Sequence, residues 1–157
     1  MCEVDINWKD AIENYYCKYN NIDNNKINEK GKNMLLDIFI QKPELSNIKL
    51  LINMNFDYKI KDNYGNNIMH IAASSTQQHN EFWKWIVKNN NPLFELMNEK
   101  NKGGCTVWHY LKNIKCNRFW DAVVTRDKNF YKYFSEFDNK GNTVWHYAVL
   151  YVNSEKF

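Results

Sequence analysis

Cysteine and histidine residues that could bind a metal or act in catalysis lie close together in one part of the chain. Cys105 precedes His109 by four residues, and Cys116 follows that histidine by seven. Thiolate and imidazole are ligands that zinc prefers, and a cysteine near a histidine is also the pair that a thiolate nucleophile needs. The chain has no C-x-x-C pair, however, and its glycines lack the spacing of a phosphate-binding loop. The sequence therefore favours no metal, no cofactor and no catalytic residues.

The histidine of this cluster belongs to a pentapeptide that the chain repeats. The residues TVWHY begin at Thr106 and again at Thr143, 37 residues later. A wider pattern, Gly-x-x-x-x-His, joins three pairs of residues: Gly65 and His70, Gly104 and His109, and Gly141 and His146. A degenerate copy begins at Gly31 with Leu36 in the histidine position, so the glycines are spaced by 34, 39 and 37 residues. This period indicates a repeated structural unit rather than an active site.

Each copy shows the same order of local signals. A polar turn precedes the glycine, a short apolar helical pattern follows it, and a second apolar run lies beyond a polar break. Asp62 and Asp138 begin turns in which an aspartate can hydrogen-bond the backbone and a glycine tolerates positive φ. Thr106 and Thr143 stand where a helix begins, so we expect their hydroxyls to cap free N–H groups. The sequence predicts turn, helix, turn and helix in each unit.

The apolar residues after each glycine have the spacing of one buried helical face. This pattern places Trp108 and Trp145, the tryptophans of the two TVWHY copies, in the core. In FWKWIV, Trp83 and Trp85 would point about 200° apart on one helix, so at least one is expected to be exposed or at an interface. The segment from Pro92 to Lys100 is either a local core or an anchor for a partner.

The stretch Ile48 to Ala73, IKLLINMNFDYKIKDNYGNNIMHIAA, resembles the ankyrin repeat, whose pattern runs roughly V-K-L-L-L-x-x-G-A-D-x-N-x-x-D-x-x-G-x-T-P-L-H-x-A-A. The proline of that family's T-P-L-H is absent here, and tryptophan replaces its leucine in two units. The resemblance implies an all-α, ankyrin-repeat-like solenoid of stacked helix-turn-helix units joined by β-turn fingers. The array would span residues 28–157, in units of about 28–61, 62–100, 101–137 and 138–157, after an N-terminal capping helix in 1–27.

The resemblance also implies roles for particular residues. In ankyrin-like proteins the histidine ties one repeat to the next, which implies structural roles for His70, His109, His146, Gly65, Gly104, Gly141, Thr106 and Thr143. Contact positions in that family flank the turn glycine and the exposed end of the first helix. Carried over by alignment, the protein-binding residues are Asn63, Tyr64, Asn66, Ser74, Ser75, Lys102, Cys105, Asn113, Ile114, Asn139, Lys140, Asn142, Leu150 and Tyr151.

Composition restricts the partner and the compartment. The net charge of +3 is weak for phosphate-dominated binding. Lysines recur near the turns and keep nucleic acid open as an alternative, but acidic residues interleave with them. The lysines are Lys30, Lys32, Lys61, Lys102 and Lys140, and the acidic residues are Glu29, Asp62, Glu99 and Asp138. No secretory signal and no apolar run of membrane-spanning length is recognisable, which predicts a cytoplasmic protein without a membrane partner, or one acting in a host cytosol.

The function that follows from the resemblance is a protein-binding module without catalytic activity. Small divergent ankyrin-like proteins often occlude an enzyme, so we expect an inhibitor or effector that blocks a host or competitor protein. A scaffold subunit of an endogenous complex, the ankyrin part of a larger protein and a nucleic-acid-associated protein remain alternatives. Self-association through Trp83 or Trp85 would favour an endogenous structural role.

Overall fold

The computed structural model describes Leu36, Ile40 and residues 44–54, 56–75, 79–88, 91–114, 116–126 and 128–154. Within these ranges, the backbone alone is described for 111–113 and 150–154. The capping helix predicted within residues 1–27, and the turn before Leu36, lie outside the described residues.

The described part of the chain is helical. Its elements are α3 (Leu45–Asn53), α4 (Ile68–Ser74), α5 (Asn80–Ile86), η1 (Pro92–Asn98), η2 (Val107–Asn113), α6 (Asn117–Arg126), η3 (Phe130–Ser135) and α7 (Val144–Ser154), where η marks a 3₁₀ helix. The β structure in these ranges is an isolated bridge between Phe137 and Thr143. The predicted all-α class is confirmed for this part of the chain.

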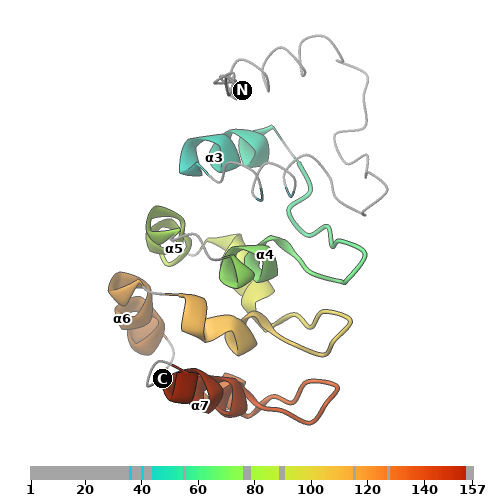
Figure 1. The fold of residues 1–157 in the computed structure, drawn as a ribbon. Coiled ribbons are helices and arrows are strands. Elements are labelled where there is room, and N and C mark those ends of the chain that lie inside the picture. The colour runs from blue at the N-terminus through green and yellow to red at the C-terminus, as the bar shows by residue number, and fades with distance from the viewer. Residues whose placement is uncertain are drawn as a thin grey trace, which may run out of the picture.

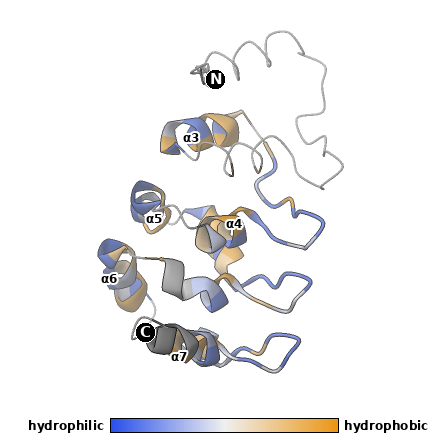
Figure 2. Cartoon of the chain, in the orientation of Figure 1, coloured by the Kyte–Doolittle hydropathy of each residue, from blue (hydrophilic) through white to orange (hydrophobic). Residues whose placement is uncertain are grey.

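The helices lie in successive tiers (Figure 1). α3, α5 and α6 follow one another along one side, and the loops before α4, η2 and α7 project together on the other. α4 packs on η2, η2 packs on α7, and α5 packs on α6. The projecting loops are coloured largely as hydrophilic, whereas apolar residues concentrate on the helices (Figure 2). Each loop therefore carries polar side chains on a support of packed helices.

Aromatic side chains fill the core between tiers. Trp108 is 1% exposed, its ring stacks on Tyr133 with centroids 5.4 Å apart, and its Nε1 donates to Asn98 Oδ1 at 2.7 Å. Trp83, also buried, packs edge-on against Phe119 across the contact between α5 and α6. These contacts join one tier to the next, so the tryptophans stabilise the stacking as well as each helix.

One expectation about tryptophans is wrong. Trp145, expected in the core, is 55% exposed, because no described element lies over the outer face of α7. Trp83 is buried, so of the two tryptophans considered for self-association it is the one that is not available at the surface. Trp85 is half-buried and lines a pocket of about 590 Å³, where Lys49 Nζ lies 5.6 Å from its ring centre.

The segment from Pro92 to Lys100 contributes to the core. Asn91 Oδ1 caps η1 by accepting from the Leu93 N–H at 3.0 Å, and proline occupies the first helical position, where its missing N–H costs nothing. Leu93, Leu96 and Met97 are buried. η3 holds the same place before the next turn. The segment was expected to be either a local core or an anchor for a partner, and these three side chains form part of the core.

The first helix after Gly104 differs from the expected α-helix. η2 is a 3₁₀ helix, and Tyr110 inside it has φ −102° and ψ 15°, outside helical values. The run is therefore two short turns across a kink. None of the helices in the described ranges is both long and apolar enough to span a membrane.

Candidate functional site

Three polar turns, at residues 62–66, 101–105 and 138–142, share one geometry; we call them the turn row. In the first, Asp62 Oδ1 accepts from the N–H groups of Tyr64 and Asn66 at 2.9 and 2.8 Å. Asp138 Oδ1 does the same for Lys140 and Asn142, both at 2.8 Å. In the middle turn Asn101 replaces the aspartate and accepts from Gly103 and Cys105. A side-chain oxygen thus fixes each turn in the same shape.

Successive turns are bonded directly to each other. The Lys102 N–H donates to Tyr64 O at 3.0 Å, and the Asn139 N–H donates to Gly103 O at 2.9 Å, one unit further on. A Cβ at Gly65 would lie 2.8 Å from Lys102 N, and one at Gly104 would lie 2.7 Å from Asn139 N. These two glycines are needed both for their φ of +77° and for this close approach. The row is consequently a rigid, continuous edge.

The repeated histidines also connect neighbouring turns. Nε2 of His70 lies 2.9 Å from Cys105 O, and Nε2 of His109 lies 3.1 Å from Glu136 O. The Thr106 N–H donates to His109 Nδ1 at 3.1 Å, so the ring proton is on Nε2 and is donated to the carbonyl. His146 receives the same bond from the Thr143 N–H, but the described residues provide no acceptor for its Nε2.

The threonines bond differently from the expectation. The hydroxyls of Thr106 and Thr143 lie 3.0 and 2.9 Å from Nδ1 of His109 and His146. They therefore orient a ring rather than cap backbone N–H groups. Asn67, which stands in the threonine position of the first unit, does cap α4, because its Oδ1 accepts from the N–H groups of Met69 and His70.

This change at Asn67 leaves His70 facing two oxygens. Asn67 Oδ1 lies 2.8 Å from Nδ1, and Cys105 O lies 2.9 Å from Nε2; both oxygens can only accept. A doubly protonated ring would satisfy both, yet burial lowers the pKa of His70 and Lys61 acts in the same direction. The Cys105 carbonyl and the carboxylates of Glu99 and Asp62 oppose this, without reversing it. The neutral ring donates to one oxygen only.

Stability is expected to fall as the pH is lowered from about 7.5 to 5.5. Because the pKa of His70 is lowered from its ordinary 6.5 in the folded state, the unfolded chain binds more protons in this range. The pKa of His79 is lowered by burial as well. We expect a His70→Gln variant to lose less stability over this range than the wild type, as measured by urea unfolding at each pH. Parallel pH profiles would contradict this assignment.

A polar cluster lies where the last two turns meet. Tyr147 Oη donates to Asp138 Oδ2 at 2.6 Å, and Cys105 Sγ lies 4.0 Å from the same oxygen. Burial acts to raise the pKa of Asp138, but the bonds from Tyr147 and from backbone N–H groups hold it below its ordinary range. Burial and Asp138 raise the pKa of the Cys105 thiol. Cys105 therefore stays a thiol, which is a poor nucleophile and a poor metal ligand.

The sequence does not favour the zinc site considered at Cys105, His109 and Cys116. His109 and Cys116 have other partners in the structure. Cys116 Sγ lies 3.8 Å from the carbonyl oxygen of Asn80 in α5, whereas His109 is in η2 and its Nε2 faces Glu136 O. Within the described ranges, no three His, Cys, Asp or Glu side chains gather as a metal site would require.

The predicted binding residues whose side chains are described fall into three groups. Those with exposed side chains are Asn63, Tyr64, Ser74, Lys102, Asn139 and Lys140. Partly buried ones, several of them bonded within the row, are Asn66, Ser75, Cys105 and Asn142. Ile114 is buried at 3% exposure, so its expected availability to a partner is wrong. The side chains of Asn113, Leu150 and Tyr151 are not described.

Sequence reasoning missed Asn101 and Tyr147. Asn101 fixes the middle turn, and its Nδ2 also donates to Asn66 Oδ1 at 2.9 Å. Its position, three residues before the glycine as for Asp62 and Asp138, was a usable signal. Nothing in the spacing of Tyr147 indicated that its hydroxyl would reach Asp138.

Comparisons with known proteins assign no family. No family model and no curated protein matches the chain. One solved structure to which it is similar is that of the Bd0816 predatory endopeptidase from Bdellovibrio bacteriovorus in complex with immunity protein Bd3460. The similarity covers 91% of this chain and 86% of the matched chain, at 18% identity and a TM-score of 0.40. Similarity at this level carries no argument about function.

Proposed function

We propose that this chain is a divergent array of ankyrin-type repeats that binds another protein through the turn row and catalyses no reaction. The observation that carries the proposal is the line of exposed tip side chains, Tyr64, Lys102 and Lys140, on turns that are bonded side by side. Tyr64 is 74% exposed. Because the backbone beneath these side chains is already ordered, binding would lose little conformational entropy.

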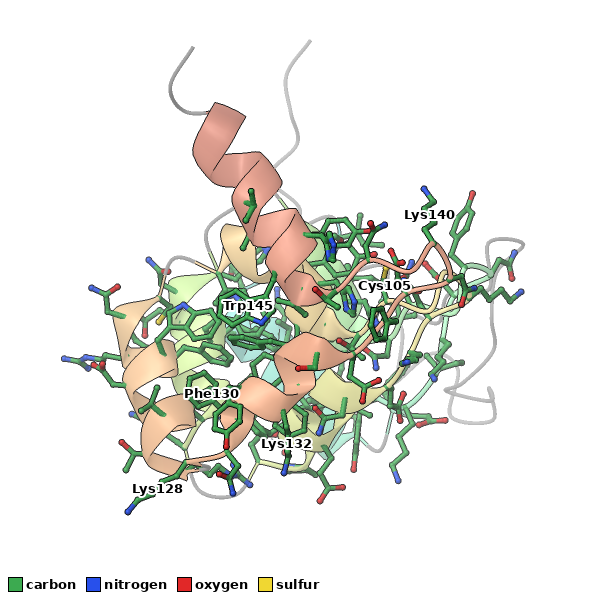
Figure 3. The ribbon with its side chains drawn as sticks, turned by 90° about the horizontal axis from the view of Figure 1, so that it is seen from below. Cys105, Lys128, Phe130, Lys132, Lys140 and Trp145 are labelled. Atoms are coloured by element: carbon green, nitrogen blue, oxygen red, sulfur yellow. The ribbon has the colours of Figure 1, made fainter. Side chains whose placement is uncertain are left out.

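The tip side chains suit a protein surface that carries carboxylates. Neither Lys102 nor Lys140 forms an ion pair with another described residue, so both ammonium groups are free for a partner. Tyrosine supplies contact area and a hydroxyl at a low cost in side-chain entropy. Figure 3 shows Lys140 at the outer end of its loop, away from the helices.

A nucleic-acid partner is the weaker alternative. Lys61 pairs with Glu99 at 3.0 Å and Lys100 pairs with Glu136 at 2.9 Å, so the lysines at the base of the row are already neutralised. Exposed tyrosines can stack on bases, but Tyr110 and Tyr147 are half-buried and bonded within the row. Lys30 and Lys32 lie outside the described residues.

We further propose that binding blocks the working surface of the partner, as an inhibitor or effector would. This finer form rests on the resemblance to small ankyrin-like proteins. If the captured partner is an enzyme, one equivalent of this protein is expected to suppress its activity. If the enzyme kept its full activity in the saturated complex, the proposal of inhibition would be wrong, whereas the proposal of protein binding would stand.

The test is capture of partners by the immobilised protein from lysates of the source organism and of its host. We expect a Tyr64→Ala, Lys102→Ala, Lys140→Ala triple variant to bind the captured protein at least about 30-fold more weakly, corresponding to about 2 kcal/mol. The matched control changes the same residue types outside the turn row: Lys128→Ala, Tyr131→Ala and Lys132→Ala, all exposed. Figure 3 shows Lys128 and Lys132 far from Lys140.

Each outcome of this comparison has one meaning. Loss in the tip variant alone supports the turn row as the binding surface. Equal affinity of all three proteins, or a greater loss in the control, would contradict it. Retention of nucleic acid that moderate salt removes would favour the alternative, because phosphate contacts weaken steeply with salt.

A further inference from the structure

A pocket lies between α3 and α5, on the side of the tiers away from the turn row (Figure 1). Its volume is about 590 Å³, within the range of roughly 300–1,000 Å³ that holds small organic ligands. Leu45 and Ile52 of α3 and Leu93 of η1 form its apolar wall, and the half-buried Tyr58 lies among them. None of the described lining residues belongs to the turn row, so this pocket is a separate candidate site.

The tryptophan in this pocket is not required for stacking the tiers. The Phe-Trp pair at 82–83 recurs 37 residues later at 119–120, and by the same shift Trp85 corresponds to Ala122. The first pair is buried and joins α5 to α6, whereas Trp85 is half-buried and lines the pocket. Its ring packs on Phe82, with the ring centroids 6.1 Å apart. Trp85 therefore presents a supported aromatic surface to the pocket, at a position where the next unit has only a methyl group.

The pocket carries an excess of positive charge. Lys49 and Lys88 line it, both are exposed, and neither forms an ion pair with another described residue. Lys49 Nζ lies 5.6 Å from the centre of the Trp85 ring, close enough for a cation–π contact. Among the described lining residues the carboxylate is that of Glu81, and Lys84 already binds it. Two ammonium groups are thus available to an anion.

Asn91 adds a buried polar group to the lining. The residue is 8% exposed, and its Oδ1 accepts from the Leu93 N–H at 3.0 Å. This bond leaves the two N–H groups of the amide, for which the described residues provide no acceptor. A nearly buried amide needs an acceptor, and an oxygen of a ligand in the pocket would supply it.

We propose that this pocket binds a small organic carboxylate with an aromatic body. The aromatic group packs on the ring of Trp85 and against the apolar wall. Lys49 and Lys88 supply the opposite charge for the carboxylate, and Asn91 Nδ2 donates a hydrogen bond to the ligand. This binding is independent of the binding of a protein to the turn row.

A cationic ligand fits the pocket less well. Aromatic faces attract cations, but the ammonium group of Lys49 already lies near the ring of Trp85. A cation would also meet the charge of Lys88, and the carboxylate that could neutralise it, on Glu81, is engaged by Lys84. The charges of the lining therefore favour an anion.

The experiment is a titration of the ¹⁵N-labelled full chain with 3-phenylpropionate, followed by NMR. The reporter is the indole N–H signal of Trp85, which is identified as the signal that a Trp85→Leu variant lacks. We expect a dissociation constant below about 1 mM. The uncharged 3-phenylpropanamide and the cationic 3-phenylpropylamine, which have the same body, should bind at least about tenfold more weakly.

Variants of the lining test the roles of the charges. Lys49→Gln and Lys88→Gln should each weaken binding by about 3–10-fold, and Lys49→Arg should bind within about twofold of the wild type. Glu81→Gln should tighten binding, because it removes a negative charge and frees Lys84. The Tyr64→Ala, Lys102→Ala, Lys140→Ala variant is the control and should bind the probe as the wild type does. A failure of the turn row to bind protein would therefore leave this result unchanged.

Four outcomes would overturn the proposal. The first is no shift of the Trp85 signal with about 10 mM 3-phenylpropionate. The others are equal binding of the amide and the acid, tighter binding of the amine, and unchanged affinity in both Lys49→Gln and Lys88→Gln. Thermal unfolding of each variant shows whether it is folded, and because the two lysines are exposed, we expect both variants to unfold as the wild type does.

Discussion

Replacing Trp108 by alanine is expected to lower the free energy of unfolding by about 3–5 kcal/mol. The ring is 1% exposed, stacks on Tyr133 and packs near Phe94 and Phe134. Its loss leaves a cavity between the tiers, which the short, kinked helix η2 and its neighbours can fill only partly. Asn98 also loses the donor for its Oδ1. Urea unfolding followed by circular dichroism measures the change.

The second TVWHY copy supplies the control. Trp145→Ala removes the same side chain from the same pentapeptide, but the ring is 55% exposed and packs mainly on Phe134. We expect a loss of about 1–2 kcal/mol. Equal losses at the two positions would mean that the pentapeptide acts locally, and that Trp108 does not join two tiers.

Gly104→Ala is expected to be the second strongest change. The residue has φ +77°, which costs about 1–2 kcal/mol for alanine. The new Cβ would also lie 2.7 Å from Asn139 N and in contact with Asn139 Oδ1. Asn139 cannot retreat without losing its N–H bond to Gly103 O and its Nδ2 bond to Lys102 O. Forced contact of this kind costs a further 1–3 kcal/mol or so, about as in an overpacked core.

Gly141→Ala separates these two costs. Its φ of +76° gives the same backbone strain, but a Cβ there meets nothing within 4 Å. We expect about 1–2 kcal/mol for this variant, so the difference from Gly104→Ala measures the contact between turns. If thermal or urea unfolding gave the same loss for both, the close approach of successive turns would not contribute to stability.

The sequence predicted the parts of the fold that depend on local periodicity. The three Gly-x-x-x-x-His copies correspond to three turns with positive φ followed by helical runs at 68–74, 107–113 and 144–154. Turn chemistry is local, because an Asp or Asn oxygen reaches N–H groups two and four residues ahead. Such features can be recognised without knowing the packing. The division of residues 28–157 into four units remains a prediction.

Features that depend on neighbours across the tiers were not predictable in this way. The two TVWHY copies are identical in sequence, yet Trp108 is buried and Trp145 exposed, because burial is decided by what lies on the next tier. Ile114 follows a helix end, where exposure is common, but it faces the core and its carbonyl accepts from Trp120 Nε1 at 2.9 Å. Long-range contacts of this kind leave no mark on the periodicity.

The candidate surface could be located from the sequence, but not its internal bonding. Tyr64, Lys102 and Lys140 flank turn glycines and are exposed as expected for tips. Asn66, Cys105 and Asn142 flank the same glycines and are partly buried, with bonds to Asp62, Asn101 and Asp138. The tip residues are accordingly free for a partner, whereas the residues behind them hold the turns in shape.

The central claim, that a partner protein covers the turn row, is tested most directly by lysine acetylation of the free chain and of its captured complex. Lys102 and Lys140 are expected to lose reactivity several-fold in the complex, while Lys128 and Lys132, which are exposed outside the turn row, react as before. Mass spectrometry reads all four sites from one sample. Protection of Lys128 and Lys132 with unchanged labelling of Lys102 and Lys140 would contradict the claim.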